Sequence, residues 1–207
     1  IANTPADGLI TGLAKINSKL FSSEKTNCVV VAYDYTVLAG TQGFINHRKK
    51  DRIFEVAKRN MTPVVLFAEG GGGRPGDTDA PGVAGLDVMS FASFAQLSAL
   101  VPLVGIASGY CFAGNAALLG CCDVVIATEN SNIGMAGPAM IEGGGLGVVK
   151  PTDIGPIATQ TLNGVVDVRV VDEAEAVAVA RKYLSYFQGV TTVFSRHSDD
   201  ALRELVP

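Results

Sequence analysis

Tryptophan is absent from this sequence, and charged residues are few. Charged side chains make up 17% and hydrophobic side chains 48% of the 207 residues, which is enough for one α/β domain with a sizeable core. The net charge of −4 argues against a general binder of nucleic acids. A local basic patch could still hold one phosphate group.

Histidine is rare as well, which limits the chemistry that imidazole could support. His47 and His197 have no partners at metal-ligand spacing. We therefore predict no metal site and expect both histidines at the surface. A general-base role for His47 stays open as an alternative.

Paired cysteine motifs and long apolar runs are also missing. The four cysteines form no Cys-x-x-Cys motif, and they are Cys28, Cys111, Cys121 and Cys122. We expect buried, reduced thiols, as in cytoplasmic proteins, with a strained redox pair at positions 121 and 122 as the alternative. The longest apolar run, residues 97–106, contains a serine and a proline and is too short to span a bilayer. No signal peptide is visible, and we expect a cytoplasmic protein without a membrane partner.

Short apolar runs rich in β-branched residues recur along the chain, at residues 28–32, 64–68, 103–107 and 124–127. Strands that are buried on both faces have this composition. Helical patterns follow or separate them at residues 42–60, 83–100, 112–119 and 173–187. This alternation predicts an α/β domain.

Two turns after these strands are rich in glycine and other very small residues. The first, residues 69–76, contains four consecutive glycines, which allow positive φ angles and let a ligand approach the backbone. Successive N–H groups in such a turn can hold an anion. A phosphate loop would end in Gly-Lys-Ser or Gly-Lys-Thr, whereas this run ends in Gly73-Arg74-Pro75. A nucleotide site is therefore disfavoured, and a plain surface turn stays open.

The second turn, residues 108–115, places Gly114 after Ala113 in the expected first turn of a helix. The first N–H groups of a helix have no intrahelical acceptor. Two turns that each supply an N–H group would form an oxyanion hole, as the enolate of a thioester requires.

Residues 104–134 resemble the oxyanion-hole segment of the crotonase superfamily: a strand, a small-residue turn, a glycine-bearing helix, a Cys-Asp pair and another strand. The resemblance implies a crotonase-like spiral of repeated ββα units, an acyl-CoA substrate and an oligomer. In the hydratase branch two catalytic glutamates occupy the positions of Ala117 and Gly137. Neither residue can transfer a proton, so a hydratase mechanism is poorly supported.

Further motifs resemble, in order, the N-terminal domain of the carboxyltransferase component of biotin-dependent acyl-CoA carboxylases. They lie at residues 7–12 (DGLITG), 35–40 (YTVLAG), 70–74 (GGGGR), 136–138 (AGP), 153–156 (DIGP) and 202–207 (LRELVP). By this resemblance, residues 1–194 form the domain, and residues 195–207 begin a linker to a C-terminal crotonase-like domain.

The matching positions imply two groups of site residues. Backbone donors for catalysis are expected at Gly71, Gly72, Gly73, Ala113 and Gly114. Substrate contacts are expected at Lys49, Arg74, Ala136 and Gly137, with Lys49 at the CoA phosphates. Three alternatives stay open: the basic run of Arg48, Lys49, Lys50 and Arg52 as a solvated face, Arg74 paired with an acid, and Asp34 and Glu69 as turn caps.

The function implied is that of a carboxyltransferase half-domain that binds acyl-CoA and stabilises its enolate. Biotin, carried as carboxybiotin on a partner domain, would supply both the carboxyl group and the base. The implied partners are the C-terminal carboxyltransferase domain, the biotin carboxyl carrier, the biotin carboxylase and further copies of the chain. The alternatives are a decarboxylase of malonyl- or glutaconyl-type CoA and a non-catalytic scaffold.

Overall fold

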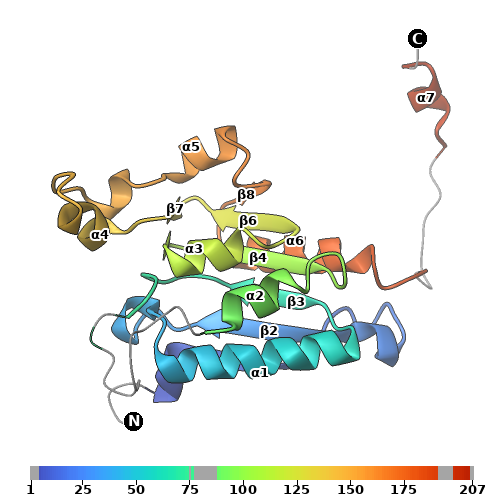
Figure 1. Ribbon diagram of the computed structural model, residues 1–207. Helices are drawn as coiled ribbons and strands as arrows, with labels where there is room; N and C mark the ends of the chain where they lie inside the picture. Colours follow the sequence, from blue (N-terminus) through green and yellow to red (C-terminus); the bar gives the residue numbers. More distant parts are fainter. Residues whose placement is uncertain (1–4, 75, 77–87, 191–197, 206–207) are drawn as a thin grey trace.

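The structure is a computed structural model that describes residues 5–74, 76, 88–190 and 198–205. Its centre is a twisted sheet with the strand order β1-β2-β3-β4-β6-β8 (Figure 1). All neighbouring strands of this sheet run parallel except β1 and β2, which form an antiparallel pair. The strands are β1 (Leu9–Lys15), β2 (Asn27–Tyr33), β3 (Val64–Phe67), β4 (Leu103–Ala107), β6 (Val124–Thr128) and β8 (Val168–Val170).

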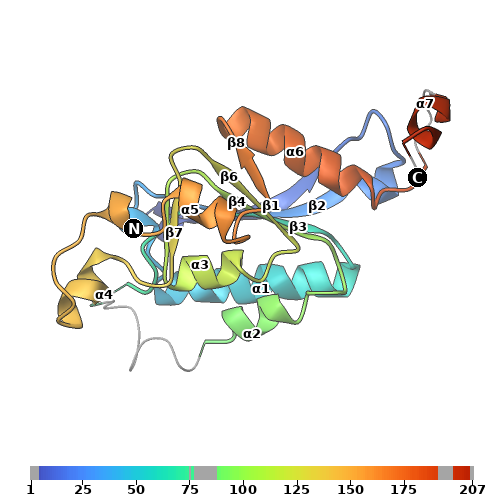
Figure 2. The same cartoon turned by 90° about the horizontal axis from the view of Figure 1, so that it is seen from above.

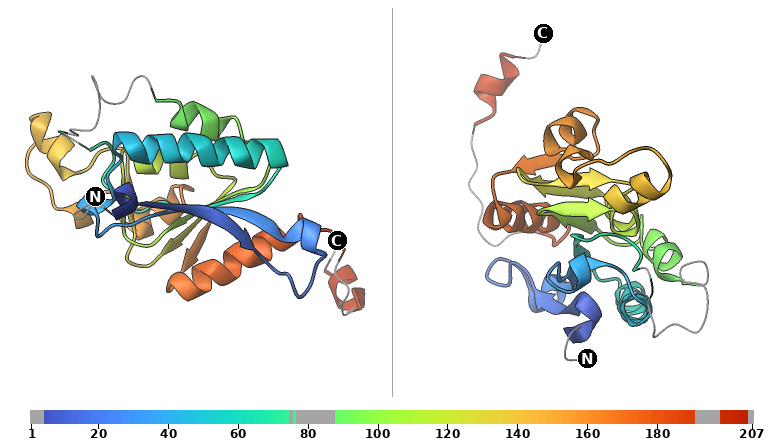
Figure 3. Two further views of the ribbon diagram at one scale, coloured as in Figure 1. Left: turned by 90° about the horizontal axis from the view of Figure 1, so that it is seen from below. Right: turned by 90° about the vertical axis from the view of Figure 1, so that its left-hand side faces the viewer.

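Helices cover both faces of the sheet, so the molecule has three layers (Figures 2 and 3). One face carries α1 (Phe44–Asn60), α2 (Ser90–Ala95) and α3 (Gly114–Leu119), and the other carries α6 (Glu173–Ser185). Phe54 of α1 and Phe94 of α2 pack together in the first core layer, with ring centroids 4.7 Å apart. Ala176, Ala180 and Leu184 of α6 belong to the second core layer, on the opposite side of the strands.

A second sheet of two short parallel strands stands beside the main one. It pairs β5 (Tyr110–Phe112) with β7 (Asn132–Gly134). The chain thus runs β4-β5-α3 and then β6-β7-α4, where α4 spans Pro138–Gly143 and is followed by α5 (Ile157–Leu162). This is the repeated ββα pattern that the resemblance to the crotonase superfamily implies.

Four of the six main strands confirm the sequence prediction, since β2, β3, β4 and β6 coincide with the four apolar runs. Helices α1 and α6 are also confirmed. The helix expected at residues 112–119 begins two residues later, at Gly114, because residues 110–112 form β5.

The long helix expected at residues 83–100 is wrong within the described part of the chain. Residues 83–87 lie outside the described residues, and α2 covers only Ser90–Ala95. Ala99 has a φ of 63°, a left-handed conformation that no helix continues through, and Pro102 follows soon after.

Two polar residues that were expected at the surface are buried instead. His47 is 7% exposed, and its Nδ1 lies 3.0 Å from the Ser90 Oγ. Lys50 is completely buried, so the solvated-face interpretation of the basic run fails for it. Both lie on the face of α1 that also carries Phe54 and Ala57. His197 lies outside the described residues.

The four cysteines are free thiols. Cys28 and Cys111 are buried as expected, whereas Cys121 and Cys122 are only partly buried. Burial raises the pKa of the Cys28 thiol to about 12, which keeps that thiol protonated and unreactive. Within the described ranges, no helix has the length and apolar character needed to cross a bilayer. The same ranges contain no group of three potential metal ligands.

Candidate active site

The two glycine turns, residues 69–76 and 108–115, are joined by backbone hydrogen bonds. The Gly70 N–H donates to the Tyr110 carbonyl, and the Phe112 N–H donates to the Gly70 carbonyl, both at 2.8 Å. The first turn therefore extends the small sheet beside β5. Since the first turn leaves β3 and the second leaves β4, the parallel pairing of these strands brings both turns to one edge of the main sheet.

Gly72 and Gly114 meet where the two turns touch, and this meeting point is called the glycine contact below. Gly72 has a φ of 88°, and a Cβ at this position would lie 2.6 Å from the Ala113 Cβ and 3.4 Å from the Gly114 nitrogen. No other residue fits this contact without displacing the second turn. Ala113 adopts a φ of 50° and a ψ of −119°, an uncommon conformation for a residue with a side chain. The backbone here is strained at the point where the chain enters α3.

The structure narrows the set of backbone donors that the sequence predicts. The N–H groups of Gly71, Gly72 and Ala113 already donate to the Ala39 carbonyl (3.0 Å), the Asn115 Oδ1 (3.1 Å) and the Gly134 carbonyl (2.9 Å). Among the described residues, no acceptor faces the N–H groups of Gly73 and Gly114. Those two are the donors left for a ligand, while the other three hold the turns in place.

Three buried polar side chains lie behind the glycine contact, and the sequence patterns did not single them out. The Lys50 Nζ donates to the Gln42 Oε1 (2.6 Å), and the Gln42 Nε2 donates to the Asn115 Oδ1 (3.0 Å). The Lys50 Nζ also donates to the Tyr33 hydroxyl (2.9 Å). One signal pointed to Lys50: it precedes Phe54 by four positions, so helical periodicity places it on the buried face of α1.

Burial governs the electrostatics of Lys50. Its side chain lies near the rings of Tyr33 and Phe91, with Nζ 5.4 Å and 5.9 Å from their centroids. Burial lowers the pKa of the Lys50 ammonium well below its usual value, and Asp51 and then Asp7 partly oppose this. The group forms no ion pair with any carboxylate that the structure describes.

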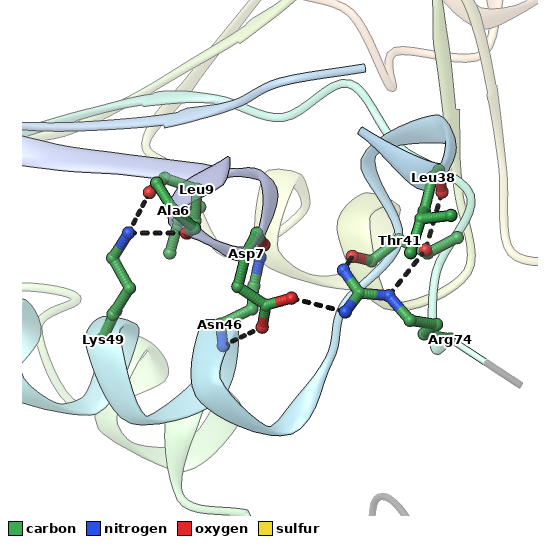
Figure 4. A network of polar contacts seen from close by, with 8 residues as sticks. All are labelled: Ala6, Asp7, Leu9, Leu38, Thr41, Asn46, Lys49 and Arg74. Atoms are coloured by element: carbon green, nitrogen blue, oxygen red, sulfur yellow. Dashed lines mark hydrogen bonds and ion pairs between the residues drawn. The ribbon is translucent and has the colours of Figure 1, made fainter. Parts of the chain in front are cut away.

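Asp7 connects the N-terminal segment, α1 and the first glycine turn (Figure 4). Its carboxylate forms an ion pair with Arg74 and accepts a hydrogen bond from the Asn46 N–H in the first turn of α1 (2.6 Å). Arg74 also donates to the Thr41 carbonyl (3.0 Å). The structure therefore places Arg74 in the paired role that the sequence left open, with its guanidinium anchoring the glycine turn.

The side chain of Lys49 points toward the start of β1. Its Nζ donates to the carbonyls of Ala6 (2.8 Å) and Leu9 (Figure 4). Desolvation lowers the pKa of the Lys49 ammonium, against a smaller opposing effect of Asp7. Its contact with CoA phosphates stays a prediction.

Ala136 and Gly137 lie on the other side of the second glycine turn. They follow β7, whose Gly134 carbonyl accepts the Ala113 N–H. A Cβ at Gly137 would lie 3.5 Å from the Phe112 ring, so this loop packs directly against the second glycine turn. The structure thus brings these predicted substrate contacts to the same edge as Gly73 and Gly114.

The two acids at strand ends cap turns, as the sequence alternative had it. Asp34 accepts from the Thr36 N–H (2.9 Å), and Glu69 accepts from the Ser108 N–H. Burial raises the pKa of the Glu69 carboxyl, which is held against the backbone. Both acids therefore have a structural role in holding the turns.

The comparisons with known proteins agree on one family. The profile of the carboxyl transferase domain matches residues 2–204. The uncharacterized carboxylase YngE of Bacillus subtilis is 30% identical over 187 residues, which are 88% of this chain and 35% of that protein. The mitochondrial methylcrotonoyl-CoA carboxylase beta chain of Dictyostelium discoideum is 30% identical over 184 residues, 87% of this chain and 30% of that protein.

Solved structures give the same result. A single-chain, multi-domain long-chain acyl-CoA carboxylase is 59% identical with a TM-score of 0.93, and the match covers 100% of this chain and 20% of that one. The transcarboxylase 12S structure with methylmalonyl-CoA bound is 24% identical with a TM-score of 0.75, over 97% of this chain and 39% of that one, and supports the fold alone. The chain therefore spans between a fifth and about two fifths of the length of these four proteins. It has a crotonase-like fold and belongs to the carboxyl transferase domain family.

Proposed function

We propose that this chain is the acyl-CoA-binding half of a biotin-dependent carboxyltransferase. One observation carries the proposal: the Gly114 N–H has no acceptor among the described residues, and its nitrogen lies beside Gly72, where a Cβ would be 3.4 Å away. A thioester oxygen that approached there would accept a hydrogen bond from Gly114. Negative charge develops on this oxygen when the α-proton leaves, so the bond strengthens as the enolate forms.

Gly73 supplies the second donor. Gly73 is exposed, and a Cβ at this position would have no atom of the described residues within 4 Å, so a flat ligand can approach the backbone closely. This N–H could serve the thioester oxygen or the carbonyl oxygen of biotin, and both assignments stay open. The surroundings therefore fit a ureido ring as well as an acyl-CoA.

The chain's own acids do not act as the base in this proposal. Asp7 is paired with Arg74, and Glu69 is bound to the Ser108 N–H. When bound, carboxybiotin supplies the carboxyl group and the ureido nitrogen that accepts the α-proton. The role of this chain is to bind the thioester, orient its α-carbon and hold the negative charge on its oxygen.

The 59% identity to a long-chain acyl-CoA carboxylase supports carboxylation of a long-chain acyl-CoA. A Pseudomonas malonate decarboxylase shares only the fold, at 20% identity and a TM-score of 0.65. The sequence match is thus stronger on the carboxylase side. We further propose that residues 195–207 lead to a C-terminal carboxyltransferase domain, and that a biotin carboxyl carrier, a biotin carboxylase and further copies of the chain complete a cytoplasmic enzyme.

Calorimetric titration with acetyl-, propionyl- and a long-chain acyl-CoA tests the proposal, with free biotin as a separate titrant. Gly114→Pro removes the N–H, whereas Gly114→Ala keeps it. A Cβ at this position meets the Gln42 Nε2 at 3.0 Å in both variants, so Gly114→Ala is the matched control for crowding. We expect saturable binding that Gly114→Pro weakens at least about tenfold more than Gly114→Ala does. Equal binding by the two variants would favour the scaffold alternative.

A further inference from the structure

Lys50 is an unusual residue for a protein interior. It is 0% exposed and lies among Tyr33, Phe91 and Gln42, without a carboxylate partner in the described chain. Burying an amine without a counter-charge is unfavourable, and hydrogen bonds to neutral groups offset only part of this cost. The hydrogen bonds of Lys50 lead directly to the glycine contact.

The direction of these hydrogen bonds is set by chemistry. An ammonium has only donors, so Gln42 must present its Oε1 to Lys50 and its Nε2 to the other side. Asn115 must then present its Oδ1 to that amide nitrogen, and the same oxygen accepts the Gly72 N–H. The Asn115 Nδ2 is left for the carbonyls of Gly40 and Glu69, both at 3.3 Å. Each side-chain nitrogen in this series of hydrogen bonds thus donates to at least one acceptor.

Gln42 is held in place by its backbone as well. Its N–H donates to the Gly72 carbonyl (2.7 Å), and its carbonyl accepts the Arg74 N–H (3.0 Å). Its side-chain amide packs against the α-carbon of Gly114, where a Cβ would lie 3.0 Å from Nε2. Gln42 therefore touches both glycines of the contact, and Lys50 determines which way its amide faces.

We propose that Lys50 is a positioning residue for the backbone donors. Through Gln42 and Asn115 it fixes the Gly72 turn, and thereby the place of the Gly114 N–H relative to a bound thioester oxygen. This series of contacts, the relay from Lys50 through Gln42 and Asn115 to Gly72, does not require the charge. The Gly72 N–H fixes the Asn115 Oδ1 and thereby the Gln42 amide, and a neutral amine also donates to the Gln42 Oε1. The effect on substrate rests on the proposed function, whereas the effect on the Gly72 N–H does not.

The test uses the 207-residue chain with three variants, each checked for folding by circular dichroism and thermal unfolding. Lys50→Met removes the donor at similar volume. Gln42→Glu keeps an acceptor for Lys50 but removes the donor to Asn115. Lys58→Met is the control, because Lys58 lies on the same helix with an exposed hydrogen bond to Gln96.

Two readouts separate the relay from the proposed function. The first is the amide proton shift and hydrogen-exchange rate of Gly72 in ¹⁵N spectra, without ligand. We expect Lys50→Met and Gln42→Glu to shift this signal and to speed its exchange about tenfold or more, with Lys58→Met unchanged. The second is the carbonyl ¹³C shift of a labelled acyl-CoA. Its downfield displacement on binding should shrink in the same two variants, and affinity should fall about tenfold.

An unchanged Gly72 signal in Gln42→Glu would overturn the proposal, because that variant keeps the contact of Lys50 and breaks only the relay. If Lys50→Met does not fold, Gln42→Glu decides alone. If the unmodified chain binds no acyl-CoA, the proposed function fails while the Gly72 readout still decides the relay.

Discussion

At the scale of single residues, the glycine contact depends on one missing methyl group. Gly72→Ala would place a Cβ 2.6 Å from the Ala113 Cβ and force alanine to a φ of 88°. We expect this variant to lose about 2–4 kcal/mol of unfolding free energy and the binding of acyl-CoA. Gly73→Ala is the matched control, since a Cβ there meets no atom within 4 Å in the part of the chain that the structure describes, and its N–H is kept. Urea denaturation measures the unfolding free energy of both variants, and equal losses of unfolding free energy would contradict the contact described.

Cys28 makes the stability of the protein sensitive to alkaline pH. Its folded-state pKa is raised from 9.0 to about 12, so above pH 9.0 the unfolded chain holds fewer protons than the folded chain. Stability is fully present below that pH and falls as the pH rises, by up to about 1.4 kcal/mol per pH unit from this thiol. Cys28→Ala should flatten the decline between pH 9 and 11 in urea titrations, and Cys121→Ala, which is less buried, should flatten it less. An unaltered slope in Cys28→Ala would rule out this source.

Residue-level prediction from the sequence succeeded for local backbone features. The glycine run after a strand predicted positive φ angles, which Gly72 adopts, whereas a ligand site there stays a prediction. Asp34 accepts a hydrogen bond within its own turn, as the alternative interpretation expected. It failed for Lys50, because a basic run at a helix start favours a solvated face, and for His47, because a histidine without metal-ligand partners was expected at the surface. Only three-dimensional packing against Phe91 and Ser90 buries them. Which N–H groups stay free depends on distant carbonyls, such as that of Gly134, which local sequence does not specify.

At the scale of elements, the Asp7–Arg74 pair joins three segments that are far apart in the sequence. Its side chains are 13% and 11% exposed, so the pair is poorly screened by water. We expect Asp7→Asn to lower the unfolding free energy by about 2–3 kcal/mol, since Arg74 is left without its counter-charge. The control is Glu55→Gln, which breaks an Arg59 pair with side chains 75% and 56% exposed and should change stability by less than about 1 kcal/mol. Thermal unfolding compares the two, and similar losses would show that burial does not distinguish these pairs.

Strands with a continuous apolar pattern could be predicted from the sequence. Strands that form only because they pair with a neighbouring strand could not. β2, β3, β4 and β6 are buried strands with a strong local signal. β1 was missed because it is an antiparallel edge strand that leaves Ile10 and Leu13 exposed and contains Gly12, so its pattern resembles a loop. β5 and β7 have only three residues each and exist because they pair with each other across the chain.

At the scale of the whole molecule, this chain is expected to bind substrate without turning it over. Asp7 is paired with Arg74 and Glu69 accepts the Ser108 N–H, and in the proposed function the base is biotin on a partner domain. Calorimetry should detect acyl-CoA binding, whereas transfer of a labelled carboxyl group from added free carboxybiotin to acyl-CoA should stay near background. Turnover should appear when the rest of a related carboxylase is supplied. Catalysis by the chain alone would contradict this expectation and require a base on these 207 residues.

The hydrogen bonds between Gly70 and the second glycine turn have a kinetic consequence. Because the two turns are already fastened to each other before any ligand arrives, binding need not order them. A ligand would then lose little affinity to conformational entropy, and its association rate should rise linearly with concentration, without the plateau that a slow rearrangement imposes. Such a site is preorganised, and it would select among acyl groups by the fixed shape of its binding surface rather than by a change of conformation.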